Sequence, residues 1–303
     1  MSLSHYEWNG DACMNNISII AVATNYTYHI YRNFICSLYN TGYEGECFIL
    51  IDEKSIPETR GLRGTFIPIE KYIPNNLDIH IQNYRLKIYQ NILEDYTIPG
   101  SHIFFCDFRD LLFQKNINEY PLGNHDLYLF QEDQIIKNCE FNRSNYDRTK
   151  ANVFKHIDYI DNPILCSGTI LIKNNLALDF MKQYYIYIRQ CMDYLDPKLI
   201  DINRQLPLKE ILIEDQDVLN YMYYDNQIKL DTKVLTNLDN LVNTMAYAVK
   251  SEINTATVND QGYIVNANGE ISYIGHQFDR LGQRQLFKLF GKFPFISTGH
   301  VIL

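Results

Sequence analysis

The sequence lacks the runs of residues that mark several large classes of protein. No stretch of its 303 residues approaches the roughly 20 consecutive apolar residues of a membrane helix, so no integral membrane segment is expected. Its start has no basic region followed by an apolar core, as a secretory signal would have. There is no long basic block, and 36 acidic against 27 basic residues give a formal charge of -9, which disfavours nucleic acid as a partner.

Closely spaced cysteines are also lacking. The seven cysteines are scattered, odd in number and never form a CxxC pair, which is typical of reduced thiols in a cytosolic protein. We therefore expect a cytoplasmic protein without disulfides and without a catalytic cysteine. The cysteines are Cys13, Cys36, Cys47, Cys106, Cys139, Cys166 and Cys191.

Several catalytic motifs are missing as well. The absence of GxxxxGK[ST] and of GxGxxG after a strand disfavours P-loop phosphotransferases and Rossmann dinucleotide enzymes. There is no HExxH zinc motif and no GxSxG nucleophile elbow. Any catalytic chemistry of this protein must therefore depend on residues outside these motifs.

The apolar material that is present suffices for a globular core. Hydrophobic residues make up 46% and charged residues 21%, which is a normal globular composition. Although 303 residues could hold two domains, α/β units often run to about 250 residues as one domain. We expect one domain, residues 1–303, with elaborations.

The first part of the chain has the pattern of a βαβ unit. Ile17–Thr24 and Cys47–Ile51 are short apolar runs typical of buried strands, and Tyr28–Tyr39 between them has apolar residues at helical spacing. Asp52 follows the second strand. The pattern predicts a parallel sheet with polar residues at the carboxyl ends of its strands.

Further elements follow along the chain. The polar, irregular segment Glu132–Asp161 is predicted to be a long insertion that covers a site. A hairpin is expected where Asn266–Gly269 separates Gly262–Val265 from Ile271–Ile274, followed by a C-terminal helix. The other predicted elements are strands at Thr65–Ile69, Asp126–Gln131 and Ile164–Ile172, and helices at Asn83–Leu93, Asn174–Tyr194 and Asp215–Tyr224.

The most informative segment is an apolar run that stops at two carboxylates. Ile103–Cys106 reads as a strand buried on both faces, and Asp107 and Asp110 follow it with Arg109 between them. Because ligands gather at the carboxyl ends of such strands, the two acids suit a divalent cation that binds a diphosphate. The alternative is a solvated turn in which one acid caps a helix and pairs with Arg109.

The order of the motifs resembles that of GT-A nucleotide-sugar glycosyltransferases. Within that class it is similar to a plant and microbial family related to the mucilage and callose regulators, whose acid motif reads DxRDxxFQ. The resemblance covers about Ile17 to Arg284. It rests on Asp107–Gln114, Cys139–Asn142, Cys166–Gly168, Asp215–Gln216 with Asn220, and His276–Arg280.

The resemblance implies a GT-A fold, a Rossmann-like mixed sheet flanked by helices. It divides the chain into a nucleotide-binding half, about 15–135, and an acceptor-side half, about 136–303. It also implies a cation held by Asp107, Asp110 and His276. A nitrogen donor beside carboxylates favours Mn²⁺ over Mg²⁺. GT-A enzymes in general have a DxD motif, and Arg109 stands where that motif has its second acid. The metal could therefore be replaced by a bidentate contact from Arg109 to the diphosphate.

The same resemblance suggests the remaining site residues. Asp215, Gln216 and Glu132 are the catalytic candidates near the sugar, with Asp133 as a further acid. The donor would contact Thr24, Asn25, Arg85, Asp107, Arg109, Ser167, Gly168 and Arg280. For Arg85 and Lys87 a solvated helix charge is the favoured alternative. Asp215 could instead be a first-turn acid, Ser167 and Gly168 a tight strand contact, and Asp279 with Arg280 a helix-capping pair.

The predicted function is transfer of a sugar from a nucleotide-diphosphate donor, with a UDP-sugar first in order, to a glycan, protein or small-molecule acceptor. Two other functions stay open. A nucleotidyltransferase or donor hydrolase would use the same cation, and a silent nucleotide- or sugar-binding module would have Arg109 in place of a needed carboxylate. The sequence does not define the acceptor, the stereochemical outcome or the oligomeric state.

Overall fold

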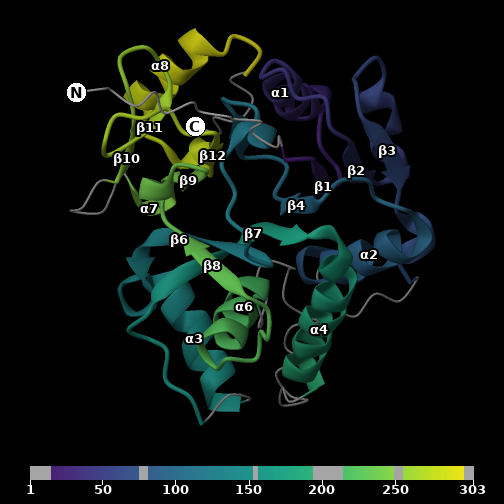
Figure 1. The fold of residues 1–303 in the computed structure, drawn as a ribbon, viewed down its shortest axis with the longest axis vertical. Helices are drawn as coiled ribbons and strands as arrows, with labels where there is room; N and C mark the ends of the chain where they lie inside the picture. Colours follow the sequence, from purple (N-terminus) through teal and green to yellow (C-terminus); the bar gives the residue numbers. More distant parts are fainter. Residues whose placement is uncertain (1–14, 75–80, 153–155, 194–213, 249–254, 297–303) are drawn as a thin grey trace, which may run out of the picture.

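A computed structural model describes residues 15–74, 81–152, 156–193, 214–248 and 255–296 (Figure 1). The start of the chain with Cys13, and Tyr194 at the end of one predicted helix, lie outside the described residues.

A seven-stranded mixed sheet forms the centre of the molecule, in the order β3-β2-β1-β4-β7-β6-β8. The first four strands are parallel, β7 is antiparallel to both β4 and β6, and β8 is parallel to β6. The strands are β1 (Ile17–Ala23), β2 (Cys47–Ile51), β3 (Thr65–Pro68), β4 (His102–Cys106), β6 (Leu127–Ile135), β7 (Pro163–Lys173) and β8 (Thr232–Leu235).

One face of the sheet is covered by long helices, which Figure 1 shows below the sheet. They are α2 (Ile81–Asp95), α4 (Asn174–Asp193), α6 (Asp215–Tyr224) and α3 (Glu140–Asn152). In α2 the stripe Tyr84, Ile88 and Ile92 is buried, at the spacing that places residues on one side of a helix. The side chains on this face form one apolar core with the strands.

The opposite face is covered by α1 (Tyr28–Tyr39) and by a small second sheet, β5-β12-β9 (Figure 1). Its strands are β5 (Leu111–Phe113), β12 (Ile274–His276) and β9 (Val242–Thr244). Strand β12 is antiparallel to β5 and parallel to β9. This pairing brings the segment after residue 270 next to the segment that follows the acids.

A third, smaller apolar cluster lies beyond the second sheet. It joins Phe278, Leu286 and Leu289 of the C-terminal segment to short strands, and Figure 1 shows α8 packed over them. Its elements are α7 (Met245–Ala248), β10 (Ala256–Val258), β11 (Ile264–Asn266), the 3-10 turn η6 (Phe278–Arg280) and α8 (Gln283–Lys292).

The predicted mixed α/β architecture with flanking helices is confirmed. The βαβ unit, the strand before Asp107 and helices α4 and α6 lie where the sequence predicted them, to within a few residues. Within the described residues no helix has the length and apolarity to cross a membrane. The six described cysteines are free, as expected.

The prediction of an irregular insertion at Glu132–Asp161 is wrong. Strand β6 continues through Glu132 to Ile135, and α3 occupies Glu140–Asn152. The helix was not recognised because it has no apolar stripe, and its inner side is made mostly of the polar residues Asn142, Asn145 and Thr149. Such residues do not produce the periodic pattern that identifies a helix.

The predicted C-terminal hairpin is present but shorter than expected. The chain turns at Asn266–Gly269, where Gly269 has a φ of 79° and donates to the carbonyl of Asn266. The two arms form one antiparallel bridge, Val265 to Ile271, flanked by hydrogen bonds from the Asn266 N–H to the Glu270 carbonyl and from the Ser272 N–H to the Ile264 carbonyl. Strand β11 pairs with β10, and β12 joins the second sheet.

Candidate active site

The carboxyl ends of β1, β2 and β4 form one edge of the parallel half of the sheet. At this edge Asp107 directly follows β4, and Asp52 directly follows β2. Asp52 Oδ1 accepts a hydrogen bond from the backbone amide of Asn25 at 3.0 Å. Asn25 has a φ of 59°, which turns the chain sharply after β1. The polar residues predicted at strand ends therefore lie at one edge.

The start of β7 meets the same edge through an irregular stretch of sheet. The β6–β7 register passes from Leu129–Ile170 to Phe130–Cys166, so residues 167–169 bulge out of that pairing. The amide of Asp107 donates to the carbonyl of Gly168 at 2.6 Å. A Cβ on Gly168 would lie 2.2 Å from Asp107 Oδ2, so only glycine allows this approach.

Arg85 joins two of the predicted acids. Its Nη1 contacts Asp107 Oδ1 at 2.5 Å, and its Nη2 contacts Asp215 Oδ2 at 2.6 Å. The Arg85 side chain is only 12% exposed, so the solvated alternative is wrong. Burial lowers the pKa of Arg85, but Asp215 and Asp107 outweigh it and raise that pKa well above its usual value.

Asp215 is fully buried at the first residue of α6, so it is a first-turn acid, and it also contacts Arg85. Its Oδ1 accepts from Ser167 Oγ at 2.9 Å. Helix α6 is held in place by Asn220, whose side-chain amide bonds both the N–H and the carbonyl of Leu165 at 2.9 Å. The Asp-Gln and Ser-Gly elements are thus brought together.

His276 and Asp110 complete the acid cluster. His276 Nε2 lies 3.3 Å from Asp107 Oδ2 and 3.9 Å from Asp110 Oδ1, and its Nδ1 lies 3.6 Å from Cys166 Sγ. The β5–β12 register, which pairs Leu111 with His276, produces this arrangement. No helix follows Asp110, so the helix-cap alternative is wrong for it.

Charge interactions set the pKa values in this cluster. Burial raises the pKa of Asp107, but Arg85 and His276 outweigh it and hold that pKa well below its usual range. Burial raises the pKa of Asp110, and the charge of Asp107 adds to this effect. Burial lowers the pKa of His276, while Cys166, Asp107 and Asp110 raise it to well above its usual value.

Asp107, Asp110 and His276 fit a divalent cation. One potential ligand atom from each residue lies within 4.8 Å of the others. Neighbouring ligands of an octahedral Mg²⁺ lie roughly 3 Å apart, so the 3.3 Å contact fits and the 3.9 Å contact needs a small contraction. Two carboxylates and one imidazole form a donor set that Mn²⁺ or Mg²⁺ accepts.

A cavity of about 310 Å³ lies beside the cluster, within the size range of small-molecule sites. Its lining includes Arg85, Asp107, Ser167 and Gly168, which take part in the network described above. The lining also includes Glu132, Phe141, Asn142, Gln216, Gln277 and Arg280. Asp107, 31% exposed at its side chain, is the member of the acid cluster that reaches this cavity.

Glu132 lies within β6, not after a strand as predicted. It is 2% exposed, and burial raises its pKa to about 7. Its Oε1 finds no hydrogen-bond partner among the described residues. Asp133 instead serves the fold, because it binds Thr255 and Asn237.

Thr24, Asn25 and Arg109 do not line this cavity. Arg109 is 48% exposed and pairs with Asp279 at 2.8 Å, so Asp279 bridges to the acid turn and does not cap a helix. Tyr26, which the sequence did not single out, stacks on Phe108 of that turn with ring centroids 6.1 Å apart. The turn after β1 therefore adjoins the acid turn.

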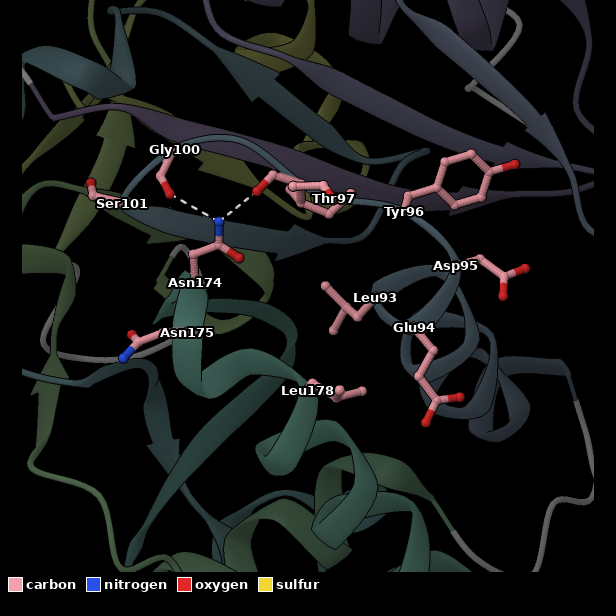
Figure 2. Close-up of a pocket in the computed structure, with 11 residues that line it drawn as sticks. Leu93, Glu94, Asp95, Tyr96, Thr97, Gly100, Ser101, Asn174, Asn175 and Leu178 are labelled. Carbon is pink, nitrogen blue, oxygen red and sulfur yellow. Dashed lines mark hydrogen bonds between the residues drawn. The ribbon is translucent and has the colours of Figure 1, made fainter.

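A larger cavity of about 600 Å³ lies at the amino end of β4, between the end of α2 and the start of α4. Figure 2 shows Asn174 there, donating to two backbone carbonyls, one of which belongs to Gly100. The two carboxylates that line this cavity form ion pairs, Glu94 with Lys182 and Asp95 with Lys71. Both carboxylates are therefore already engaged within the protein itself.

Comparisons with known proteins identify no family. The sequence matches no protein-family model and no curated protein. Among solved structures, galactosyltransferase LgtC in complex with donor and acceptor sugar analogs has 14% identity and a TM-score of 0.48, covering 86% of this chain and 87% of that chain. An active-site mutant of LgtC has 12% identity, the same coverage and the same TM-score. Likeness at this level is too distant to assign an activity.

Proposed function

We propose that this chain is a GT-A type glycosyltransferase that transfers a sugar from a nucleoside-diphosphate donor to an acceptor hydroxyl. The observation that supports this most strongly is the meeting of Asp107, Asp110 and His276 at the carboxyl end of a parallel strand, beside a polar cavity. Such an edge is where α/β proteins bind nucleotides. A hard cation held by two acids and a histidine suits a diphosphate.

Asp107, Asp110 and His276 would hold Mn²⁺ or Mg²⁺, which when bound neutralises the charge that develops on the departing diphosphate. Arg85 keeps Asp107 ionised and oriented, and Asp215 and Ser167 hold Arg85 in place. Arg280, which also lines the cavity, supplies a further positive charge for phosphate. Thr24, Asn25 and Arg109 lie on the nucleotide side of this arrangement.

In the reaction, the bond between the anomeric carbon and the diphosphate oxygen breaks, and its electron pair leaves with the diphosphate. The acceptor oxygen forms the new bond to that carbon, and its proton passes to a carboxylate. Glu132 suits this role because it lines the cavity, has a free oxygen and has a pKa of about 7. Gln216 lines the cavity beside it.

The proposal extends to the organisation of the chain as one domain, 1–303. The nucleotide-binding half, about 15–135, supplies Asp107 and Arg85. The acceptor-side half, about 136–303, supplies His276, Asp215 and most of the residues that line the cavity.

The direct test is release of nucleoside diphosphate from UDP-, GDP- and ADP-sugars with Mn²⁺ and a mixture of acceptors. We expect turnover of one donor, UDP-sugars being tested first, and a loss of about 100-fold or more in Asp110→Asn. Asp260→Asn is the matched control, because the Asp260 side chain is 98% exposed and pairs with Lys288 of α8. Equal activity of both variants would contradict the assignment of the site.

The two other functions predict different results. A nucleotidyltransferase would release pyrophosphate from a nucleoside triphosphate and a sugar phosphate. A silent binding module would bind a nucleotide without consuming any donor.

A further inference from the structure

Two residues that line the cavity each have a buried side-chain oxygen without a hydrogen-bond donor among the described residues. The oxygens are Oε1 of Glu132 and Oε1 of Gln277. The two residues are 2% and 7% exposed, respectively. Because a buried acceptor without a donor costs free energy, such pairs in a cavity indicate a ligand that brings hydroxyl or amide hydrogens.

Gln277 is fixed in an unusual backbone conformation. Its φ is 56°, in the left-handed region that a residue with a side chain rarely occupies. It directly follows His276 and precedes η6, so the second sheet and the 3-10 turn hold it from both sides. A strained residue whose side chain lines a cavity is characteristic of functional sites.

An apolar ring adjoins these oxygens. Phe141, in the first turn of α3, is 54% exposed and lines the same cavity. Among the described lining residues it is the one aromatic side chain. Its neighbour Asn142 is bonded to Gln216 Nε2 at 2.9 Å, which fixes the start of α3 against the site.

The charges of the lining disfavour a second anionic group besides the donor diphosphate. Two acids, Glu132 and the buried Glu214, are among the lining residues. Arg85 is already bonded to Asp107 and Asp215, so Arg280 is the one lining cation among the described residues outside that network, and the proposed function assigns it to the diphosphate. A phosphate or carboxylate on the acceptor would therefore find no cation left to pair with.

We propose that Phe141, Glu132 and Gln277 form the acceptor subsite, and that the acceptor is an uncharged saccharide. Its hydroxyl groups donate to Glu132 and Gln277, and the C–H face of its ring packs on Phe141. The inference rests on the proposed glycosyltransferase function and names its acceptor class. A serine or threonine peptide fits this lining less well because its hydroxyl side chain has no flat apolar face, and a sugar phosphate fits less well because its phosphate brings a second negative charge.

Binding of methyl glycosides tests the inference independently of turnover. The probes are the methyl glycosides of glucose, galactose and mannose and of N-acetylglucosamine, observed by saturation-transfer NMR with the wild-type protein, UDP and Mn²⁺. We expect transfer to at least one of them, and its loss in Phe141→Ala. Phe141→Trp keeps an aromatic surface and should restore the signal. Phe287→Ala, which removes an 81% exposed ring of α8, is the matched control and should leave it unchanged.

Kinetics provide the second measurement. With the donor that the protein turns over, Phe141→Ala should raise the KM for the methyl glycoside by about tenfold or more while the donor KM stays within about twofold. Glu132→Gln keeps the shape of the side chain, and its larger effect should fall on kcat.

The possible failures can be told apart. If no nucleotide binds and no donor is consumed, the proposed function fails and this inference falls with it. If a donor is consumed but transfer goes to a serine peptide or to glucose 6-phosphate and not to any methyl glycoside, the inference alone is overturned. Unchanged glycoside binding in Phe141→Ala would also overturn it.

Discussion

Arg85 is the residue on which the acid network depends. It compensates two carboxylates at once, Asp107 and Asp215, in surroundings that leave its side chain 12% exposed. Removing one partner of a buried ion pair leaves the other charge without compensation, which costs much more than the pair contributes. Arg109, although it stands between the two acids in the sequence, is 48% exposed and pairs with Asp279.

The two arginines should therefore differ sharply in their effect on stability. Arg85→Ala is expected to lower the free energy of unfolding by about 3–5 kcal/mol. Arg109→Ala, the control, should lower it by about 0–1 kcal/mol. Urea unfolding measures both, and similar losses for the two variants would contradict the arrangement described.

Glu132 should make stability depend on pH. Burial raises its pKa from 4.5 to about 7, so the folded protein binds a proton that the unfolded chain releases between these values. The stabilisation is complete below pH 4.5 and is lost as the pH rises through about 7, in total about 3 kcal/mol. Relative to Glu132→Gln, the wild type should be less stable at pH 8 than at pH 5 by about 2–3 kcal/mol, because at pH 5 a small part of the stabilisation is already lost. A difference that does not change with pH would show that Glu132 is not buried as described.

Cys166 should influence metal affinity through His276. Its Sγ lies 3.6 Å from His276 Nδ1, on the side of the ring opposite the acids, where a partner fixes ring orientation and leaves Nε2 free to bind a metal. Cys166→Ala is expected to weaken Mn²⁺ binding about tenfold, measured by calorimetry. Cys191 is also buried but is not among the residues of the candidate site, so Cys191→Ala should leave the affinity for Mn²⁺ unchanged. Equal Mn²⁺ affinities in both variants would exclude this role.

At the scale of elements, the site depends on the bulge at the start of β7. The bulge brings Gly168 against Asp107, and a methyl group there would overlap the carboxylate. Gly168→Ala should lower stability by about 1–3 kcal/mol and abolish Mn²⁺-dependent activity. Gly291→Ala is the matched control, because a Cβ there meets nothing within 4 Å and alanine favours the α8 helix by about 1 kcal/mol. A tolerated Gly168→Ala would contradict the close contact.

Elements whose burial follows a simple period could be predicted from the sequence. The bounds of α1, β2 and α6 agree with the predicted ones, because each combines an apolar pattern with a clear stop. Helix α3 and the three-residue strands β5, β9 and β12 were missed. Their positions are determined by distant pairing, such as Leu111 with His276, and three residues are too few to show a period.

The residues of the candidate site could likewise be predicted only in part from the sequence. Asp107, Asp110 and His276 could be proposed as a group from residue types and order, and the structure brings them together. The role of Arg85 could not be predicted, because an arginine on an amphipathic helix looks solvated until both of its carboxylates are known. Tyr26 carries no local signal, since an isolated aromatic residue is common in any chain. Phe141 and Gln277 lie within Cys139–Asn142 and His276–Arg280, two segments on which the resemblance rests, but their residue types alone did not mark them as site residues.

At the scale of the whole molecule, segments far apart in the sequence meet at one sheet edge. Arg85 and Asp107 come from α2 and the turn after β4, while Asp215 and His276 come from α6 and β12. The formal charge of -9 opposes the approach of a nucleotide, so a diphosphate needs local positive charge. Nucleotide binding should therefore depend on a divalent cation, with Arg280 adding to it.

The most direct test of this account is the melting temperature of the protein with UDP, GDP, CDP or ADP, each with and without Mn²⁺. A ligand that binds the native state stabilises it by about 2.7 kcal/mol at 100 times its Kd. We expect one nucleotide to raise the melting temperature in the presence of Mn²⁺, and the rise to disappear in Asp110→Asn and His276→Ala variants that remain folded. If no nucleotide raises the melting temperature with Mn²⁺, or if both variants respond as the wild type does, the site is not a metal-dependent nucleotide site and the proposed function is wrong.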